Sequence, residues 1–174
     1  KSVDDLLEPE QPSQAELNLG SSEKCHISWE QIFDTDLEIA RKKGVERCVE
    51  LVSDVLPKIV DSFSYNDITL ICSTHKSGLG IVKKLDKKGI KTAHIFGDSK
   101  TQDFLKMNFT LTKEKIKIST VHSFKGFESP LILYFMEKNI PFEEAYTALT
   151  RLRLSKKNNN CHIKVVCIDP KYHK

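Results

Sequence analysis

Two apolar segments near the end of the chain constrain its fold more than any other feature. Residues 131–136 form a continuous apolar run, and residues 163–168 form a second one that only Lys164 interrupts. Runs of this length are typical of strands that are buried on both faces, and such strands occur mainly in parallel sheets covered by helices. The sequence therefore predicts a layered α/β domain.

The rest of the chain alternates between strand-like and helix-like patterns. Further strands are predicted at 25–30, 68–72, 92–96 and 116–120, and helices at 36–62, 77–88, 101–107 and 142–153. Pro57 predicts a kink or a break in the first helix, and Gly89 is expected to end the second. Strands that alternate with helices favour a mostly parallel sheet.

The length of 174 residues fits one domain. Residues 1–24 are rich in Glu, Gln, Pro and Ser, and we expect a linker or a disordered terminus there, with one folded domain over 25–174. The chain has no initiator Met, so we expect it to be a fragment of a larger protein. No apolar run approaches the length of a membrane helix, so no membrane partner is expected.

Charge and cysteine content narrow the functional classes. The net charge of +3 is too small to indicate nucleic-acid binding by itself, so a binding site has to be a local patch. The five cysteines are scattered and contain no CxxC pair, which predicts neither a zinc site nor a disulfide. Cys167 is expected in the core. Because no disulfide is predicted, we expect the protein to be in a reducing, intracellular compartment, such as a bacterial cytoplasm.

Several catalytic signatures are absent from the sequence. It contains no G-x-x-x-x-G-K-[ST] loop to hold phosphates, and no Asp-Glu pair after an apolar strand to hold Mg²⁺. It also lacks a G-x-S-x-G elbow and an H-E-x-x-H metal motif. We therefore expect the isolated chain to be inactive in nucleotide hydrolysis.

Two polar patterns remain as candidates for chemistry. T-x-H-S-x-K-G-x-E starts at Thr120, directly after a predicted strand, and A-x-T-R ends at Arg151 on the predicted helix 142–153. Ligands in parallel α/β sheets gather at the carboxyl ends of the strands. Taken separately, the first pattern is better explained as a plain loop with a surface ion pair, and Arg151 as a residue on the solvated face of a helix.

In this order and context, the two patterns resemble motifs five and six of UvrD-like, superfamily-one helicases. The resemblance covers residues 67–168 and implies the second of two RecA-like motor domains, a P-loop NTPase-type fold that lacks its own Walker A loop. It also implies that ATP and Mg²⁺ are held mainly by a first RecA-like domain outside this chain. The short stretch between Phe96 and Ile116 leaves no room for the large domain that bigger members insert there.

The resemblance also implies roles for individual residues. Arg151 is expected to be the catalytic arginine finger. The nucleotide-binding residues are expected to be Lys125, Gly126, Glu128, Thr150 and Arg151. The contacts to single-stranded nucleic acid, with DNA preferred over RNA, are expected to be Thr74, His75, Thr120 and His122. No metal ligands are expected. Phe124 and Phe127 are interpreted as core residues, with base stacking as the alternative.

The function implied is that of the C-terminal motor domain of an ATP-dependent helicase or translocase. One alternative is a RecA-like module that binds nucleic acid or regulates without motor activity. Another is an unrelated α/β enzyme with its site at His75 or His94, although neither histidine has a partnered nucleophile or metal spacing in the sequence.

Overall fold

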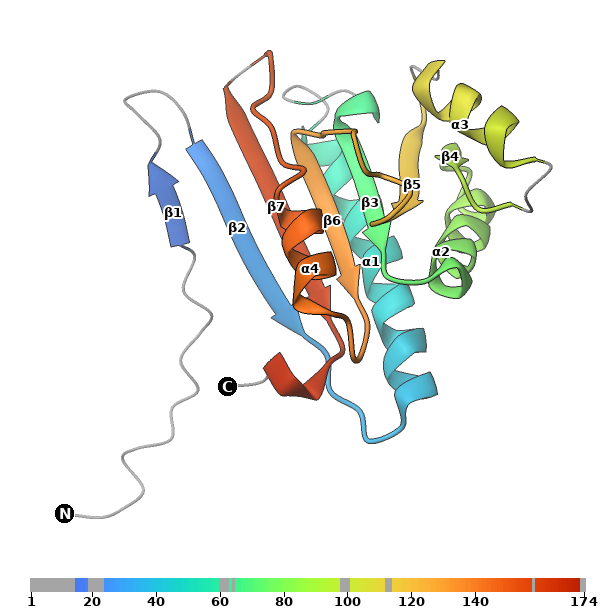
Figure 1. The fold of residues 1–174 in the computed structure, drawn as a ribbon, viewed down its shortest axis with the longest axis vertical. Helices are drawn as coiled ribbons and strands as arrows, with labels where there is room; N and C mark the ends of the chain where they lie inside the picture. The colour runs from blue at the N-terminus through green and yellow to red at the C-terminus, as the bar shows by residue number, and fades with distance from the viewer. Residues whose placement is uncertain are drawn as a thin grey trace.

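The computed structural model describes residues 15–18, 24–59, 63, 65–97, 101–111, 114–157 and 159–172. Its centre is a seven-stranded sheet in the order β1-β2-β7-β6-β3-β5-β4 (Figure 1). All neighbouring strands run parallel except β1 and β2, which are antiparallel. The predicted α/β fold with a mostly parallel sheet is confirmed.

Six of the seven strands overlap the predicted segments, and β1 was not predicted. The strands are β1 (Ala15–Asn18), β2 (Lys24–Gln31), β3 (Ile68–Cys72), β4 (Thr92–His94), β5 (Ile116–Thr120), β6 (Leu131–Met136) and β7 (Asn160–Cys167). Strand β1 lies inside the segment 1–24; residues 1–14 and 19–23 are outside the described part of the chain. The central strands β3 and β6 are almost wholly buried, as expected for continuous apolar runs.

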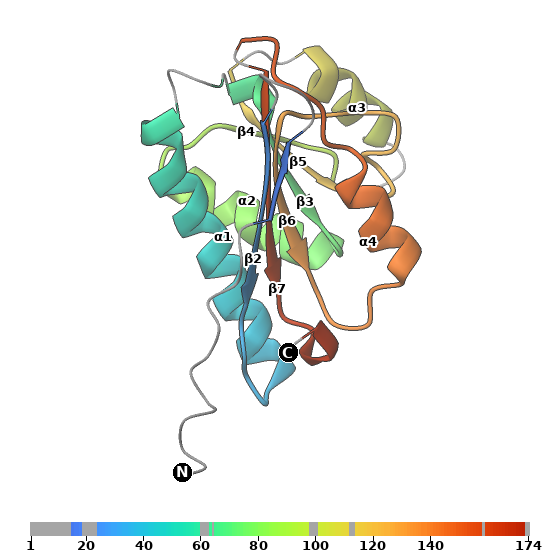
Figure 2. The ribbon, with the colours of Figure 1, turned by 90° about the vertical axis from the view of Figure 1, so that its left-hand side faces the viewer.

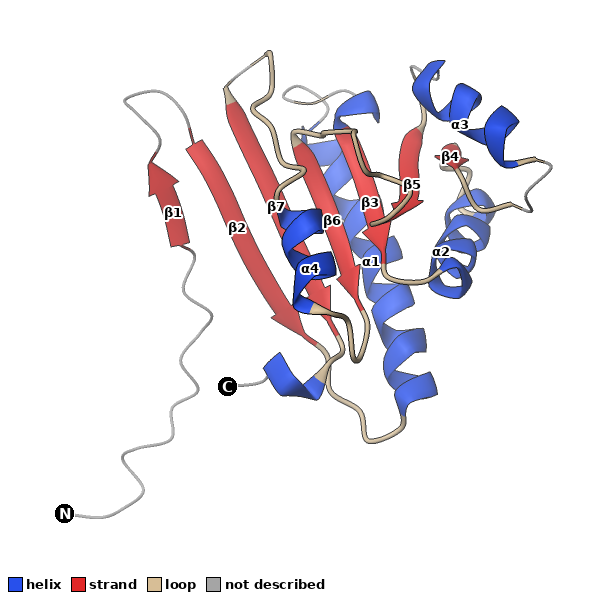
Figure 3. Cartoon of the chain, viewed as in Figure 1, coloured by secondary structure: helices blue, strands red, loops and turns tan. Residues whose placement is uncertain are grey.

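Helices cover both faces of the sheet. The helix α1 (Leu37–Ile59) and the helix α2 (His75–Lys87) pack on one face, and α3 (Gln102–Leu111) and α4 (Phe142–Leu149) lie on the other (Figure 2). Figure 3 shows the same layers by secondary structure, with the short 3-10 turns at Tyr65–Asp67 and Pro170–Tyr172. None of the helices in the described residues is long and apolar enough to cross a membrane.

An apolar core lies between the sheet and the helices on each of its two faces. The first joins α1 and α2 to the sheet through residues such as Val49, Ile81 and Phe135. The second lies under α3 and α4 and includes Phe109, Phe124 and Tyr134. Because the central strands contribute side chains to both cores, their apolar pattern has no polar alternation.

Three local expectations can be compared with the structure. Of the kink or break predicted at Pro57, the break is absent, since α1 continues to Ile59. The last helix is shorter than predicted: α4 ends at Leu149 with Thr150 as its C-cap, so Arg151 follows the helix. Gly89 behaves as expected, with a φ of 73° directly after the C-cap of α2, a backbone conformation that glycine adopts without a steric penalty.

The expectation of no disulfide is wrong. Cys25 of β2 and Cys161 of β7 form one, because the parallel register sets them opposite each other with a Cα–Cα distance of 4.7 Å. They are separated by 136 positions in the sequence, which is why spacing gave no sign of the pair. Cys167 is a buried free cysteine, as predicted. The cysteine content therefore no longer supports a reducing compartment.

Candidate functional site

The residues predicted to act together are divided between the two ends of the strands. Thr120 ends β5 and is paired with Cys72, the last residue of β3, so His122 and the turn carrying Thr74 and His75 follow neighbouring strand ends. Glu128 lies elsewhere, near the amino end of β6. The segment 121–130 connects the two places, because β6 is parallel to β5 and the chain must return before it can begin (Figure 1).

At the carboxyl ends of the strands, the predicted contacts differ in exposure. Thr120 is nearly buried, and its Oγ1 accepts a hydrogen bond from the Ser123 amide at 3.3 Å. His122 has 86% of its side chain exposed, with Nε2 3.9 Å from Oε2 of Glu144 on α4. Burial is the main cause that raises the pKa of Glu144, and the nearby imidazole partly offsets it. His122 is therefore the residue of this pair that a ligand can reach.

The β3–α2 turn is held in place by a carboxylate that the sequence analysis missed. Glu137, 2% exposed, follows β6 directly. Its side chain accepts hydrogen bonds from Thr74 Oγ1 and Ser77 Oγ at 2.6 Å each, and from Arg41 Nε at 2.7 Å. The signal was an acidic residue at the end of an apolar strand, but only the fold shows which groups meet it.

The hydrogen bonds to Glu137 determine which groups of the β3–α2 turn remain available to a ligand. Thr74 caps α2, since its Oγ1 also accepts a hydrogen bond from the Ser77 amide at 3.3 Å. Its hydroxyl is thus occupied inside the protein. His75 is the exposed residue of the turn, with its ring 5.4 Å from that of Phe96.

Near the amino ends of the strands, the backbone sets two of the predicted nucleotide-binding residues, Glu128 and Arg151, side by side. The Ser129 amide donates to the Arg151 carbonyl at 3.0 Å, and the Arg153 amide donates to the Ser129 carbonyl at 3.2 Å. Ser129 and Leu152 form a parallel bridge. Glu128 and Arg151 are consequently neighbours across two strands of backbone, although the sequence places them far apart.

The Arg151 side chain is only loosely held. Its Nε donates to the Thr147 carbonyl at 3.3 Å and its Nη2 donates to Thr150 Oγ1 at 3.4 Å, both on its own helical segment. Arg153, by contrast, lies 3.8 Å from the Asp67 carboxylate in the turn before β3. Among the described residues, Arg151 has no carboxylate partner, unlike Arg153, and it is partly exposed.

In the segment between Thr120 and Glu128, aromatic residues that pack on the core alternate with residues that are exposed to solvent. Phe124 is 1% exposed and packs edge-to-face on Phe109 at a ring distance of 6.4 Å, which confirms it as a core residue. Phe127 is partly buried beside the same rings. Lys125 and Gly126 are exposed between them, and Gly126 has a φ of 90°. The loop is thus fixed to the core at its aromatic residues and open at its charged ones.

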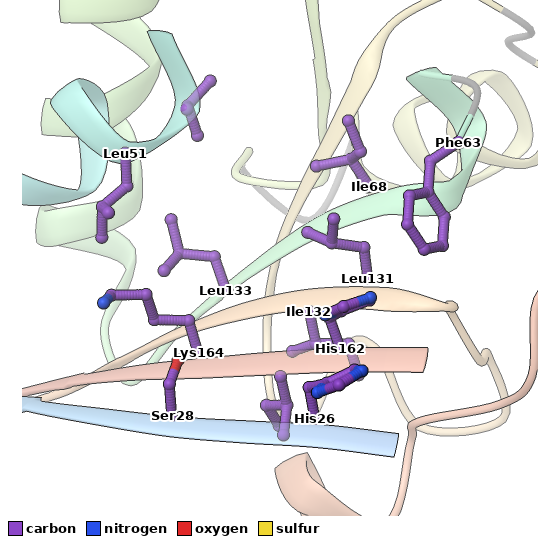
Figure 4. A pocket seen from close by; sticks show the side chains of 12 residues that line it. His26, Ser28, Leu51, Phe63, Ile68, Leu131, Ile132, Leu133, His162 and Lys164 are labelled. Atoms are coloured by element: carbon purple, nitrogen blue, oxygen red, sulfur yellow. The ribbon is translucent and has the colours of Figure 1, made fainter. Parts of the chain in front are cut away.

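Two other features lie outside these groups. A cavity of about 200 Å³ lies against the sheet on the α1 face, where His26 and His162 stack at 4.6 Å and Phe63 meets His162 edge-on (Figure 4). His94, part of one alternative hypothesis, accepts a hydrogen bond from the Phe96 amide at 3.3 Å, and burial lowers its pKa. Within the described residues, no three His, Cys, Asp or Glu side chains are grouped to hold a metal.

Comparisons with known proteins identify the fold. No protein-family profile and no curated sequence matches the chain. Among solved structures, the C-terminal part of the Fun30 ATPase domain matches with a TM-score of 0.51 at 13% identity, covering 70% of this chain and 40% of that one. Mss116p DEAD-box helicase domain 2, bound to an RNA duplex, matches with a TM-score of 0.51 at 15% identity, covering 83% and 53%.

A third structure is the E. coli DEAD-box protein SrmB bound to regulator of ribonuclease activity A. It matches with a TM-score of 0.52 at 9% identity, covering 88% of this chain and 81% of that one. At these identities the likeness shows the fold alone, which is a RecA-like α/β fold. The chain spans about half or less of the first two matched chains.

Proposed function

We propose that this chain is the second RecA-like motor domain of an ATP-dependent helicase or translocase of the UvrD-like type, acting on single-stranded nucleic acid, with DNA preferred. The observation that carries the proposal is the course of the segment 120–129. Within it, His122 lies beside the β3–α2 turn, and Glu128 lies where backbone pairing brings the segment next to Arg151. The choice of the UvrD-like type rests on the two sequence motifs.

The residues beside the Ser129–Leu152 bridge fit a triphosphate held mainly by another domain. Arg151 has a partly exposed guanidinium with two long local hydrogen bonds, so it is free to exchange them for phosphate oxygens. Thr150 orients it, and Lys125, Gly126 and Glu128 supply an exposed loop beside it. ATP with Mg²⁺, when bound by the first domain, supplies the phosphoryl group whose transfer such an arginine stabilises.

The nucleic-acid residues lie at the other end of the same segment. His122 and His75 are exposed there, whereas Thr120 and Thr74 are used mainly to shape the two turns. Phe124 anchors the segment in the core between the two ends, so a shift of Glu128 and Arg151 on domain closure would tilt the segment about this point and move His122. The segment therefore couples the two ligands.

The test compares two neighbouring arginines in the protein that carries this chain together with its first motor domain. Arg151→Ala is expected to lower strand-stimulated ATP hydrolysis by about 1,000-fold, the usual effect of removing an arginine finger. Binding of a single-stranded oligonucleotide stays within about twofold, because the phosphoryl-transfer contact is not part of strand binding. Turnover is measured by phosphate release and binding by fluorescence anisotropy.

The matched control is Arg153→Ala. Arg153 pairs with Asp67 inside the domain, so its loss costs a fraction of a kcal/mol in stability and leaves turnover unchanged. Equal, wild-type turnover in both variants contradicts the assignment of Arg151. Absence of strand-stimulated turnover in the unsubstituted protein would favour instead the alternative of a RecA-like module without motor activity.

A further inference from the structure

We propose that the cavity beside α1 binds a small carboxylic acid with an aromatic ring, its ring at one end of the cavity and its carboxylate at the other. The cavity has a volume of about 200 Å³ and is lined by α1 and the strands β2, β7, β6 and β3. A cavity of ~150 Å³ is large enough for benzene, so this one has room for a ring with a short side chain. It lies on the sheet face opposite α4 (Figure 2), and the inference goes beyond the proposed function.

One end of the cavity is formed by three rings. His26 of β2 and His162 of β7 are register partners, and their rings stack at 4.6 Å with planes inclined by 14°. Phe63 meets His162 edge-on at 5.5 Å (Figure 4). Burial, and to a smaller degree His26, lowers the pKa of His162, so this imidazole is mainly neutral at pH 7. A neutral, ring-lined end accepts another aromatic ring and does not attract an anion.

The opposite end of the cavity carries a cation. Ser28 and Lys164 are register partners on the same strands, two residues beyond the histidines. They are therefore on the same face of the sheet and about 7 Å further along it. Figure 4 shows the two side chains next to each other at this end. An ammonium and a hydroxyl that face one space are suitable donors for a carboxylate.

Lys164 can turn to a ligand without leaving a protein carboxylate unpaired. Its Nζ lies 3.2 Å from Oε2 of Glu30, and a third of its side chain is exposed. Glu30 also accepts hydrogen bonds from Nε of Arg47 at 2.6 Å and from Nη2 at 3.2 Å. Because Arg47 keeps Glu30 paired and neutralised, Lys164 is available to an anion inside the cavity.

The wall between the two ends is apolar. It is formed by Leu51 of α1, Ile68 of β3, and Leu131 and Leu133 of β6. These side chains offer water no hydrogen bonds, so they favour a ligand with a hydrocarbon stem. The spacing of about 7 Å between the ring pair and the Ser28–Lys164 pair suits a ring joined to a carboxylate through one or two methylenes. Phenylpropionate has this shape and is the probe for the test.

The experiment titrates phenylpropionate into the full chain and follows the ring-proton NMR resonances of its histidines. We expect those of His26 and His162 to shift saturably, with a Kd on the order of 1 mM for a ligand of this size. Those of His75 and His94, which lie outside the cavity, stay in place. Phenylpropionamide has the same shape without the charge, and it should bind about tenfold more weakly, because it loses the charge-assisted hydrogen bond.

Three variants locate the two ends of the ligand. Lys164→Met keeps the apolar stem without the cation, so it should bind the acid about tenfold more weakly and no better than the amide. Lys84→Met is the matched control: Lys84 pairs with Glu46 at 3.3 Å, outside the cavity, and its loss should leave both Kd values unchanged. Leu51→Trp fills the cavity from a partly buried position on α1 and should abolish binding of both probes.

Three results would overturn the inference. The first is equal affinity of the wild-type chain for the acid and the amide, which removes the role of the cation. The second is an unchanged Kd for the acid in Lys164→Met. The third is a titration in which the resonances of His26 and His162 do not move, since the ligand is then bound elsewhere or not at all.

Discussion

Two charged side chains of this domain, one on each face of the sheet, differ in how completely other groups of the folded domain satisfy their hydrogen bonds. On the α1–α2 face, the buried Glu137 carboxylate is surrounded by Arg41, Thr74 and Ser77, all within 2.7 Å. On the α3–α4 face, Arg151 reaches only its own helical segment, at 3.3 and 3.4 Å. Buried polar groups that are fully paired stabilise a structure, whereas exposed cations with weak contacts remain available to a ligand.

The largest expected effect tests the paired group. Glu137→Ala leaves the half-buried Arg41 without its main partner and two hydroxyls without an acceptor, so we expect the free energy of unfolding to fall by about 3 kcal/mol. Glu128→Ala, an exposed acid in the other group, should change it by less than about 0.5 kcal/mol. Urea denaturation followed by circular dichroism measures both, and equal losses would remove the distinction between the groups.

This contrast also shows what the sequence predicts and where it fails. Strands β3, β5 and β6 match their predicted bounds residue for residue, because continuous or alternating apolar patterns report burial directly. The partners of Glu137 could not be predicted, since they come from α1 and α2 and meet only in the folded sheet. The end of α4 was missed for a similar reason, because the residues after Thr150 pair with Ser129 rather than continue the helix.

The next prediction concerns the segment that links the nucleotide and strand residues. Gly126 has a φ of 90° with open space around its Cα, so Gly126→Ala strains the backbone without a clash and should cost about 1 kcal/mol of stability. If the segment couples the two ligands, the variant also loses stimulation of ATP hydrolysis by a single strand. Phosphate-release assays with and without oligonucleotide measure this in the protein that carries both motor domains.

Gly89 provides the matched control for that substitution. It has a φ of 73° and nothing within 4 Å of a Cβ, but it lies after α2 and away from the segment 120–129. Gly89→Ala is expected to cost about as much stability, roughly 1 kcal/mol, while leaving stimulation intact. Unchanged stimulation in both variants would contradict the coupling role of the segment.

The smallest effect is a difference in pH dependence between two acidic residues. Burial would raise the pKa of Glu30, but hydrogen bonds from Arg47 and Lys164 outweigh it and the pKa is lowered. Its stabilising contribution is therefore present above the unfolded value of about 4.3 and disappears as the pH falls through the lower folded value. Glu30→Gln should lose stability at pH 7 and lose less near pH 3.

Glu144 is expected to behave in the opposite way. Burial raises its pKa and His122 compensates only in part, so the folded state holds the proton more tightly than the unfolded chain. Stability then falls as the pH rises from about 4.3 through the higher folded value. Glu144→Gln should therefore gain up to about 0.5 kcal/mol at pH 7 and nothing near pH 3. Thermal melts at both pH values measure it, and a loss at pH 7 would mean that the contact with His122 stabilises the fold, as the Arg41 contact does for Glu137.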